Sequence, residues 1–156
     1  MIGKIILIAF IFTGINCFSQ EGLKTDKVEY QTGLTVGYVY ANTQFISIGG
    51  LIGQNYGHLK KEAIGSGLCM DVSLNTEVLT IGQKCFVEGS VNNFGLRLNL
   101  INYVRGKQND FRVRPEINFN FLSLMNISAG YALVWDDNYF KDISKFNVSV
   151  TYNFIK

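Results

Sequence analysis

Apolar and polar residues alternate over long stretches of this chain, most regularly in residues 146–154. One side of the pattern consists of Phe146, Val148, Val150, Tyr152 and Phe154, and the other of Asn147, Ser149, Thr151 and Asn153. Successive side chains of a β-strand point to opposite faces of the sheet. This stretch is therefore predicted to be a strand with one apolar face and one hydrogen-bonding face.

Residues 111–121 alternate in the same way but place charged side chains on the polar face. Aromatic and aliphatic residues at odd positions oppose Arg112, Arg114, Glu116, Asn118 and Asn120. Charges interleaved with aromatic residues are unfavourable in a soluble core, but they suit a barrel wall with lipid outside and a polar lumen inside. Pro115 cannot donate a hydrogen bond to a neighbouring strand, so we expect a bulge or a water-filled gap there.

Six further stretches alternate similarly, which makes eight predicted strands in all. They are Tyr30–Tyr40, Phe45–Asn55, Glu62–Leu74, Val78–Glu88, Phe94–Tyr103 and Ile127–Trp135. Each is roughly ten residues long, close to the 9–11 residues of a tilted strand that crosses a membrane. We therefore expect an all-β fold, an eight-stranded antiparallel up-and-down transmembrane β-barrel whose narrow interior is filled by side chains.

The pattern is weakest in the second and fourth of these eight strands. Glycines blur the second strand, and a shift of either strand by one residue would exchange its two faces. The residues assigned to the outer face in these two strands are Ile46, Ile48, Ile52, Ile81, Cys85 and Val87.

Polar and glycine-containing segments join the predicted strands at alternating ends of the barrel. With the N-terminus in the periplasm, the external connections are Ala41–Gln44, Asn75–Glu77, Arg105–Asp110 and Asp136–Lys145. The turns at the other end are Tyr56–Lys60, Gly89–Asn93 and Leu122–Met125. The last two external connections are the best candidates for contacting a partner outside the membrane.

Four basic and three acidic residues fall on the predicted inner face. They are Asp71, Lys84, Glu88, Arg97, Arg112, Arg114 and Glu116. Charges buried in a narrow lumen have to be paired or hydrated. We interpret the set as a network of ion pairs that fills the interior, because eight strands leave little space. A polar cavity that binds or conducts a solute is the alternative.

Aromatic residues gather toward both ends of the predicted strands. One group is Tyr38, Tyr40, Tyr103, Trp135, Tyr139 and Phe140, and the other is Tyr30, Phe94, Phe119, Phe121, Tyr152 and Phe154. Such clusters are typical of the aromatic girdles at the two membrane–water interfaces of a transmembrane barrel. The alternative is that they only reflect the abundance of aromatic residues in strands.

The first twenty residues have the layout of a secretory signal peptide. Lys4 precedes an apolar stretch over about residues 5–15, and small or polar residues follow at 17–20. The apolar stretch is shorter than the ~20 residues of a membrane-spanning helix. Residues 14–16 lack the leucine that usually precedes a lipid-modified cysteine, which argues against lipidation of Cys17. We expect a signal peptide at 1–20 and a barrel domain at 21–156.

Composition and cysteine positions exclude several functions. Removal of residues 1–20 takes away Lys4, one of 14 basic residues, and none of the 12 acidic residues. A nearly balanced charge without a basic block gives no support to nucleic-acid binding. Export would permit a disulfide between Cys69 and Cys85, but alternation assigns Cys69 to the polar face and Cys85 to the apolar face. Neither cysteine has the spacing of a metal site, and no cofactor is expected.

The single histidine, His58, is the main basis for an enzymatic hypothesis. Some eight-stranded outer-membrane barrels modify lipids with a histidine, a serine and an acid. His58 lies in a predicted turn, and no serine or acid can be placed beside it. We interpret it as a solvated turn residue and expect that the protein is not an enzyme.

A soluble lipocalin-like barrel in the periplasm would show the same alternation with its apolar face turned inward around a small apolar ligand. Periodicity alone does not separate the two folds. The polar face favours the membrane barrel, because glycine, serine, asparagine and threonine make it too small and too sparsely charged for a typical water-facing surface.

The signal peptide, the hairpin rhythm and the terminal strand ending Tyr152-Asn153-Phe154 resemble the small outer-membrane β-barrel proteins of the OmpA/OmpX-like type. In such proteins the C-terminal aromatic strand resembles the signal that the barrel-assembly machinery reads. The resemblance covers most of the mature chain and implies residence in the cell outer membrane, in contact with its lipid. Functions in this group include adhesion, defence and membrane anchoring. We expect a monomer with a structural or surface-interaction role.

Overall fold

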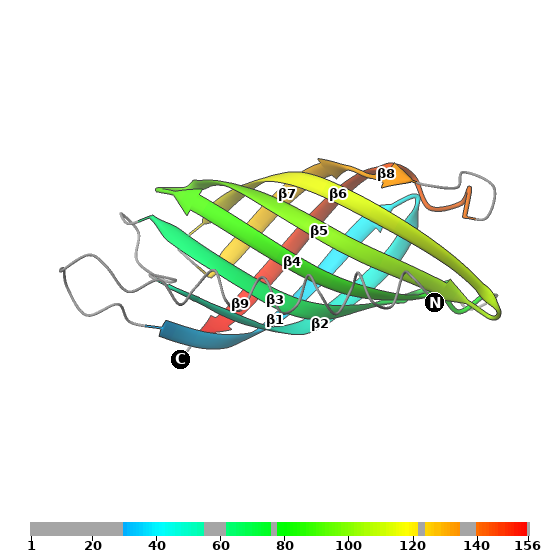
Figure 1. Ribbon diagram of the computed structural model, residues 1–156, viewed down its shortest axis with the longest axis horizontal. Coiled ribbons are helices and arrows are strands. Elements are labelled where there is room, and N and C mark those ends of the chain that lie inside the picture. The colour runs from blue at the N-terminus through cyan, green and yellow to red at the C-terminus, as the bar shows by residue number, and fades with distance from the viewer. Residues whose placement is uncertain (1–29, 55–61, 76–77, 122–123, 135–139, 156) are drawn as a thin grey trace, which may run out of the picture.

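The computed structural model describes residues 30–54, 62–75, 78–121, 124–134 and 140–155, whose strands form one antiparallel sheet. Its strands are β1 (Tyr30–Ala41), β2 (Thr43–Gln54), β3 (Ala63–Ser73), β4 (Ile81–Val91), β5 (Phe94–Arg105), β6 (Gln108–Phe121), β7 (Met125–Tyr131), β8 (Leu133–Val134) and β9 (Phe146–Ile155). Strands β1 to β7 pair with their neighbours in sequence order, and β9 pairs with both β7 and β1. The sheet therefore closes into a barrel (Figure 1).

Strands β7 and β8 are two parts of one strand, so the closed barrel has eight strands. Both pair with β6 in the same register, from Glu116 opposite Gly130 to Arg112 opposite Val134. The interruption lies opposite Arg114 and Pro115, and Pro115 has no amide hydrogen to donate across the ladder. The disturbance expected at Pro115 is thus an interrupted ladder and not a bulge, because the register is the same on both sides.

The predicted strands are present, but several turns are shorter than expected. In the structure these turns consist only of Asn42 between β1 and β2, residues 92–93 between β4 and β5, and residues 106–107 between β5 and β6. Asn42, Asn92 and Gly106 have positive φ angles, which asparagine and glycine tolerate better than other residues. The predicted loop Arg105–Asp110 is therefore wrong, since β6 already begins at Gln108. The predicted turn at residues 56–60 lies outside the described residues.

Side chains alternate as predicted in the two strands whose register was uncertain. In β2, Ile48 and Ile52 are about half exposed on the outer face, and Ser47 is buried inside. In β4, Val87 is exposed and Lys84 is buried. The predicted faces of both strands are thus confirmed.

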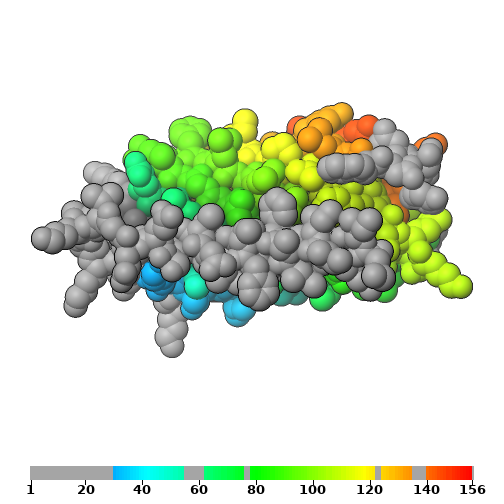
Figure 2. All heavy atoms as spheres, viewed as in Figure 1, coloured from blue at the N-terminus to red at the C-terminus, as the bar shows by residue number. Residues whose placement is uncertain are grey.

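The outer face of the barrel is apolar and the inner face is largely polar. The most exposed large hydrophobic side chains, at 64–68% of their surface, are Leu34, Leu68, Phe94, Leu96 and Ile117. Atoms of β4 to β6, in green and yellow, and of β7 and β8, in orange, form the upper part of the surface in Figure 2. Most of the fully enclosed side chains are polar or charged. Among the described residues, the usual arrangement of a soluble protein is reversed.

The two ends of the barrel differ in what they carry. Strand β1 begins and β9 ends at one end, which we call the terminal end (left in Figure 1). The turns at Asn42 and Gly106 and the segment Phe140–Lys145 lie at the opposite, distal end. No helix in the described part of the chain is long and apolar enough to cross a membrane.

Candidate functional site in the barrel interior

All seven charged residues predicted to face inward lie inside the barrel, where they are almost completely buried. An eighth, Asp110 at the start of β6, joins them and is 4% exposed. The interior of the described barrel therefore holds four bases and four acids, which are Lys84, Arg97, Arg112, Arg114, Asp71, Glu88, Asp110 and Glu116. Their charges balance.

Lys84 and Asp71 form one of the ion pairs. The Nζ atom of Lys84 on β4 lies 2.8 Å from Oδ1 of Asp71 on β3. The same ammonium group donates to the hydroxyl of Ser47 on β2 at 3.0 Å. The alternation of three neighbouring strands thus brings one base, one acid and one hydroxyl together.

A larger network crosses β4, β5, β6, β7 and β9. Arg97 lies between Glu88 and Glu116 in the strand register and donates from Nε to Glu88 at 2.6 Å. Glu116 lies 2.8 Å from Nε of Arg114. It also accepts hydrogen bonds from Ser128 at 3.1 Å and Asn147 at 2.9 Å. Each carboxylate in this network is therefore matched by a guanidinium group.

Gly130 makes room for this network. It lies opposite Glu116 in the register of β6 and β7. A Cβ atom at position 130 would lie 2.5 Å from Cγ of Glu116 and from the backbone oxygen of Pro115. A larger residue would therefore displace the carboxylate from its partners.

Arg112 forms the third centre, near the distal end. Its guanidinium group binds Asp110 at 2.7 Å and also donates to the backbone oxygens of Phe140, Ile143 and Ser144 at 2.9–3.2 Å. Asp110 was missed in the sequence because it was assigned to a loop. Its even position, shared with Arg112 and Arg114, was the available signal.

Amide and hydroxyl groups line the part of the lumen formed by β7 and β9. The buried polar residues there are Asn126, Ser128, Asn147, Ser149, Thr151 and Asn153. The hydroxyls of Ser128 and Ser149 lie 2.6 Å apart. One side of the described lumen is thus charged and the other is polar and uncharged.

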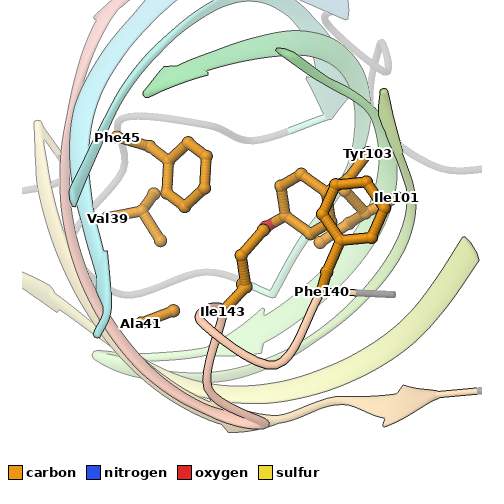
Figure 3. Close-up of a cluster of buried hydrophobic side chains, with 7 residues drawn as sticks. All are labelled: Val39, Ala41, Phe45, Ile101, Tyr103, Phe140 and Ile143. Carbon is orange, nitrogen blue, oxygen red and sulfur yellow. The ribbon is translucent and has the colours of Figure 1, made fainter. Parts of the chain in front are cut away.

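An apolar cluster occupies the lumen at the distal end (Figure 3). Its residues are Val39, Ala41, Phe45, Ile101, Tyr103, Phe140 and Ile143. Two of them correct the predicted aromatic girdle. Tyr103 is fully buried, with its ring 5.4 Å from that of Phe45, because β5 continues its alternation to Arg105. Phe140 is also inside, at 2% exposure.

Other members of the predicted girdles lie on the outer face. Tyr38, Tyr40, Tyr152 and Phe154 are 39–56% exposed. Phe119 is half-buried and packs edge-on against Phe94, with 5.2 Å between ring centroids. Trp135 and Tyr139 lie outside the described residues.

The cysteines and acidic residues that the structure describes do not gather into a metal site. Cys69 points inward and Cys85 outward from neighbouring strands, and both are free. No group of three or more histidine, cysteine, aspartate or glutamate residues in the described ranges could hold a metal ion. The predicted signal peptide and His58 lie outside those ranges. The charged groups of the lumen are therefore arranged for pairing with one another.

Comparison of the sequence with protein-family models and with curated proteins gives no match.

Proposed function

We propose that the protein is a small outer-membrane β-barrel of the OmpA/OmpX-like type, exported by a signal peptide at residues 1–20. The observation that carries this proposal is the reversed polarity of the wall. Leucine, isoleucine, valine and aromatic side chains cover the outside, and eight charged residues are paired inside. The terminal end then faces the periplasm and the distal end faces outward.

Energetics support a lipid environment for this wall. Burial of a leucine or isoleucine side chain is worth about 1.5–3 kcal/mol relative to leaving it in water. Leucine or isoleucine side chains are exposed on β1, β2, β3, β5, β6, β7 and β8, and β4 exposes Val87 and Val91. Lipid would cover them without a second protein surface. A closed sheet also satisfies most backbone groups internally, as a membrane requires.

The filled lumen supports a structural or surface-interaction role without catalysis. Ion pairs and buried amides occupy the interior, so solute passage has no support in the described residues. The partners in this proposal are outer-membrane lipid and, during biogenesis, the barrel-assembly machinery. The mature protein acts as a monomer and needs no cofactor.

Electrophoresis of the outer-membrane fraction, with and without boiling, tests the proposal. A closed membrane barrel usually stays folded in detergent until it is heated, so we expect a membrane-bound band that shifts on boiling. A protein found in the soluble periplasmic fraction without a heat shift would overturn the proposal. The soluble barrel with a small apolar ligand would then be the better explanation.

The two native cysteines allow a second test of which face meets lipid. Cys85 lies on the outer face between Leu68 and Leu100 in the register, and Cys69 faces the lumen. In liposomes, the variant Cys17→Ser, Cys69→Ser should react with a lipid-soluble maleimide and resist a water-soluble one. Rapid reaction of Cys85 with the water-soluble reagent would show that the outer face meets water.

A further inference from the structure

We propose that Phe140–Lys145, the segment before β9, is a plug that closes the distal mouth of the barrel. The sequence assigned this region to an external loop that could reach a partner. In the structure its described part turns inward, and the side chains of Phe140 and Ile143 are 2% and 3% exposed (Figure 3). This inference concerns the lumen and holds whether or not lipid surrounds the wall.

The wall of the barrel is apolar where the plug meets it. Val39 and Ala41 on β1, Phe45 on β2, and Ile101 and Tyr103 on β5 point into the lumen and surround the plug. Most other inward positions of these strands carry polar residues or glycine. Five apolar inward positions of these strands therefore gather at the distal end, where they match Phe140 and Ile143, while Leu51 on β2 packs with Phe86 in a separate cluster toward the terminal end.

Arg112, which lies inside the barrel, binds the backbone of the plug. It donates to three backbone oxygens of the segment, those of Phe140, Ile143 and Ser144. Asp110 fixes the guanidinium group through an ion pair and a hydrogen bond from Nε at 2.9 Å. Backbone carbonyls without such donors would be costly to bury among apolar side chains.

A second set of contacts fastens the plug at the rim, and we call it the latch. Both oxygens of Asp142 accept hydrogen bonds from Arg105, at 3.0 and 2.5 Å. Thr43 donates to the backbone oxygen of Asp142 at 3.1 Å, and the amide of Ser144 donates to Ala41 at 2.7 Å. The guanidinium of Arg105 also lies over the ring of Phe140. The plug is thus bound to β1, β2, β5 and β6.

A cysteine just beneath the apolar cluster can report whether the mouth is closed. Ser47 is two residues after Phe45 on β2, faces the lumen and is 2% exposed. We would place Ser47→Cys in the full chain with Cys17, Cys69 and Cys85 changed to serine. The measurement is its rate of reaction with a small water-soluble methanethiosulfonate, which forms a mixed disulfide and releases a sulfinate.

The double variant Phe140→Ala, Ile143→Ala should raise this rate by at least about tenfold, because it removes two buried apolar side chains that hold the segment in the mouth. Asp142→Asn should raise the rate less, since an exposed ion pair contributes little. Lys141→Ala is the matched control, because Lys141 is an exposed neighbour in the same segment and should leave the rate unchanged.

A second cysteine separates opening of the mouth from loosening of the whole barrel. Asn153→Cys faces the lumen near the terminal end, far along β9 from the plug, and Asn153 is 4% exposed. Its rate should stay the same in the double variant. An unchanged rate at Ser47→Cys in a double variant that stays folded, as judged by its β-sheet circular dichroism, would overturn the plug. An equal increase at both cysteines would overturn it as well. If the double variant does not fold, an unchanged rate in Asp142→Asn would count against the proposal.

Discussion

Single residues in the lumen stabilise the barrel through their partners. A buried ion pair is often no better than two well-packed apolar residues, but removal of one partner leaves an uncompensated charge. Lys84 has only Asp71 and Ser47 within hydrogen-bonding distance among the described contacts. Its pair with Asp71 can therefore be used to separate the net contribution of a buried ion pair from the cost of leaving one charge unpaired.

We expect Asp71→Leu to destabilise the barrel by about 3–5 kcal/mol, because it leaves the ammonium of Lys84 buried without a carboxylate. The double variant Asp71→Leu, Lys84→Met should recover most of this loss. The measurement is the free energy of unfolding in urea for the wild type, both single variants and the double variant. A double variant as unstable as Asp71→Leu would show that the charge pair itself is required.

The two faces of β9 give a prediction about the membrane. Val150 points outward at 41% exposure between Tyr38 and Ile127, and Thr151 points inward. Val150→Arg should cost on the order of 2–4 kcal/mol if the position faces mid-membrane lipid. Thr151→Val should cost about 1 kcal/mol at most, because it removes one hydrogen bond of 3.4 Å to Asn126. Urea unfolding in lipid measures both, and equal tolerance would contradict the assigned faces.

Among the elements, the ladder between β6 and the β7–β8 strand has a local defect that a single substitution can repair. Pro115 pairs with Leu98 on one side, but on its other side the ladder has no pair between Pro115 and Tyr131, the residue opposite it in the register. An unpaired backbone carbonyl in an apolar environment is costly. Proline also reduces the freedom of the unfolded chain, which partly offsets this cost.

Pro115→Ala should therefore stabilise the barrel by up to about 1 kcal/mol, because an added amide can complete the ladder. Ile117→Ala is the matched control, since Ile117 faces outward two residues later and its amide is already present. It should not stabilise the barrel. The midpoint of urea unfolding measures both, and a lower midpoint for Pro115→Ala would contradict the repair.

The latch at the rim predicts a small dependence on pH. Hydrogen bonds from Arg105 hold the pKa of Asp142 below its ordinary value. Such a group stabilises the fold above its unfolded pKa, about 3.9, and the contribution is lost as the pH falls through the lower, folded pKa. Asp142→Asn should thus unfold at a lower temperature than the wild type at pH 7. This difference should vanish in strong acid, and a difference that persists there would contradict the latch.

The strands and their faces could be predicted because the alternation of apolar and polar residues with a period of two can be recognised within a single short stretch of sequence. The same regularity assigned Asp71, Lys84 and Arg97 to the interior. Features that depend on contacts between distant segments of the chain could not be predicted. The inward turn of Phe140 and Ile143 depends on wall residues 28 or more positions away, and no local pattern marks it. Tyr103 was assigned to a girdle although its odd position, shared with Arg97 on the same predicted strand, already indicated the inner face. Asp110 was missed because the start of β6 depends on its pairing with β5.

At the scale of the whole molecule, the wall and the plug are held by different interactions. Strand β9 carries two ladders, one to β1 and one to β7, and these close the sheet. The plug contributes side-chain contacts and a few backbone hydrogen bonds at one end only. The ladders should therefore be sufficient for closure without the plug.

Replacement of Phe140–Ser144 by a glycine–serine linker of equal length should leave a closed barrel that still shifts on boiling. Its transition should come at a lower temperature, because the apolar cluster loses the side chains of Phe140 and Ile143. Removal of residues 146–156 should abolish the heat-resistant form, because β1 and β7 then lose their shared partner. Loss of the shift in the linker variant would show instead that the plug is needed to close the wall.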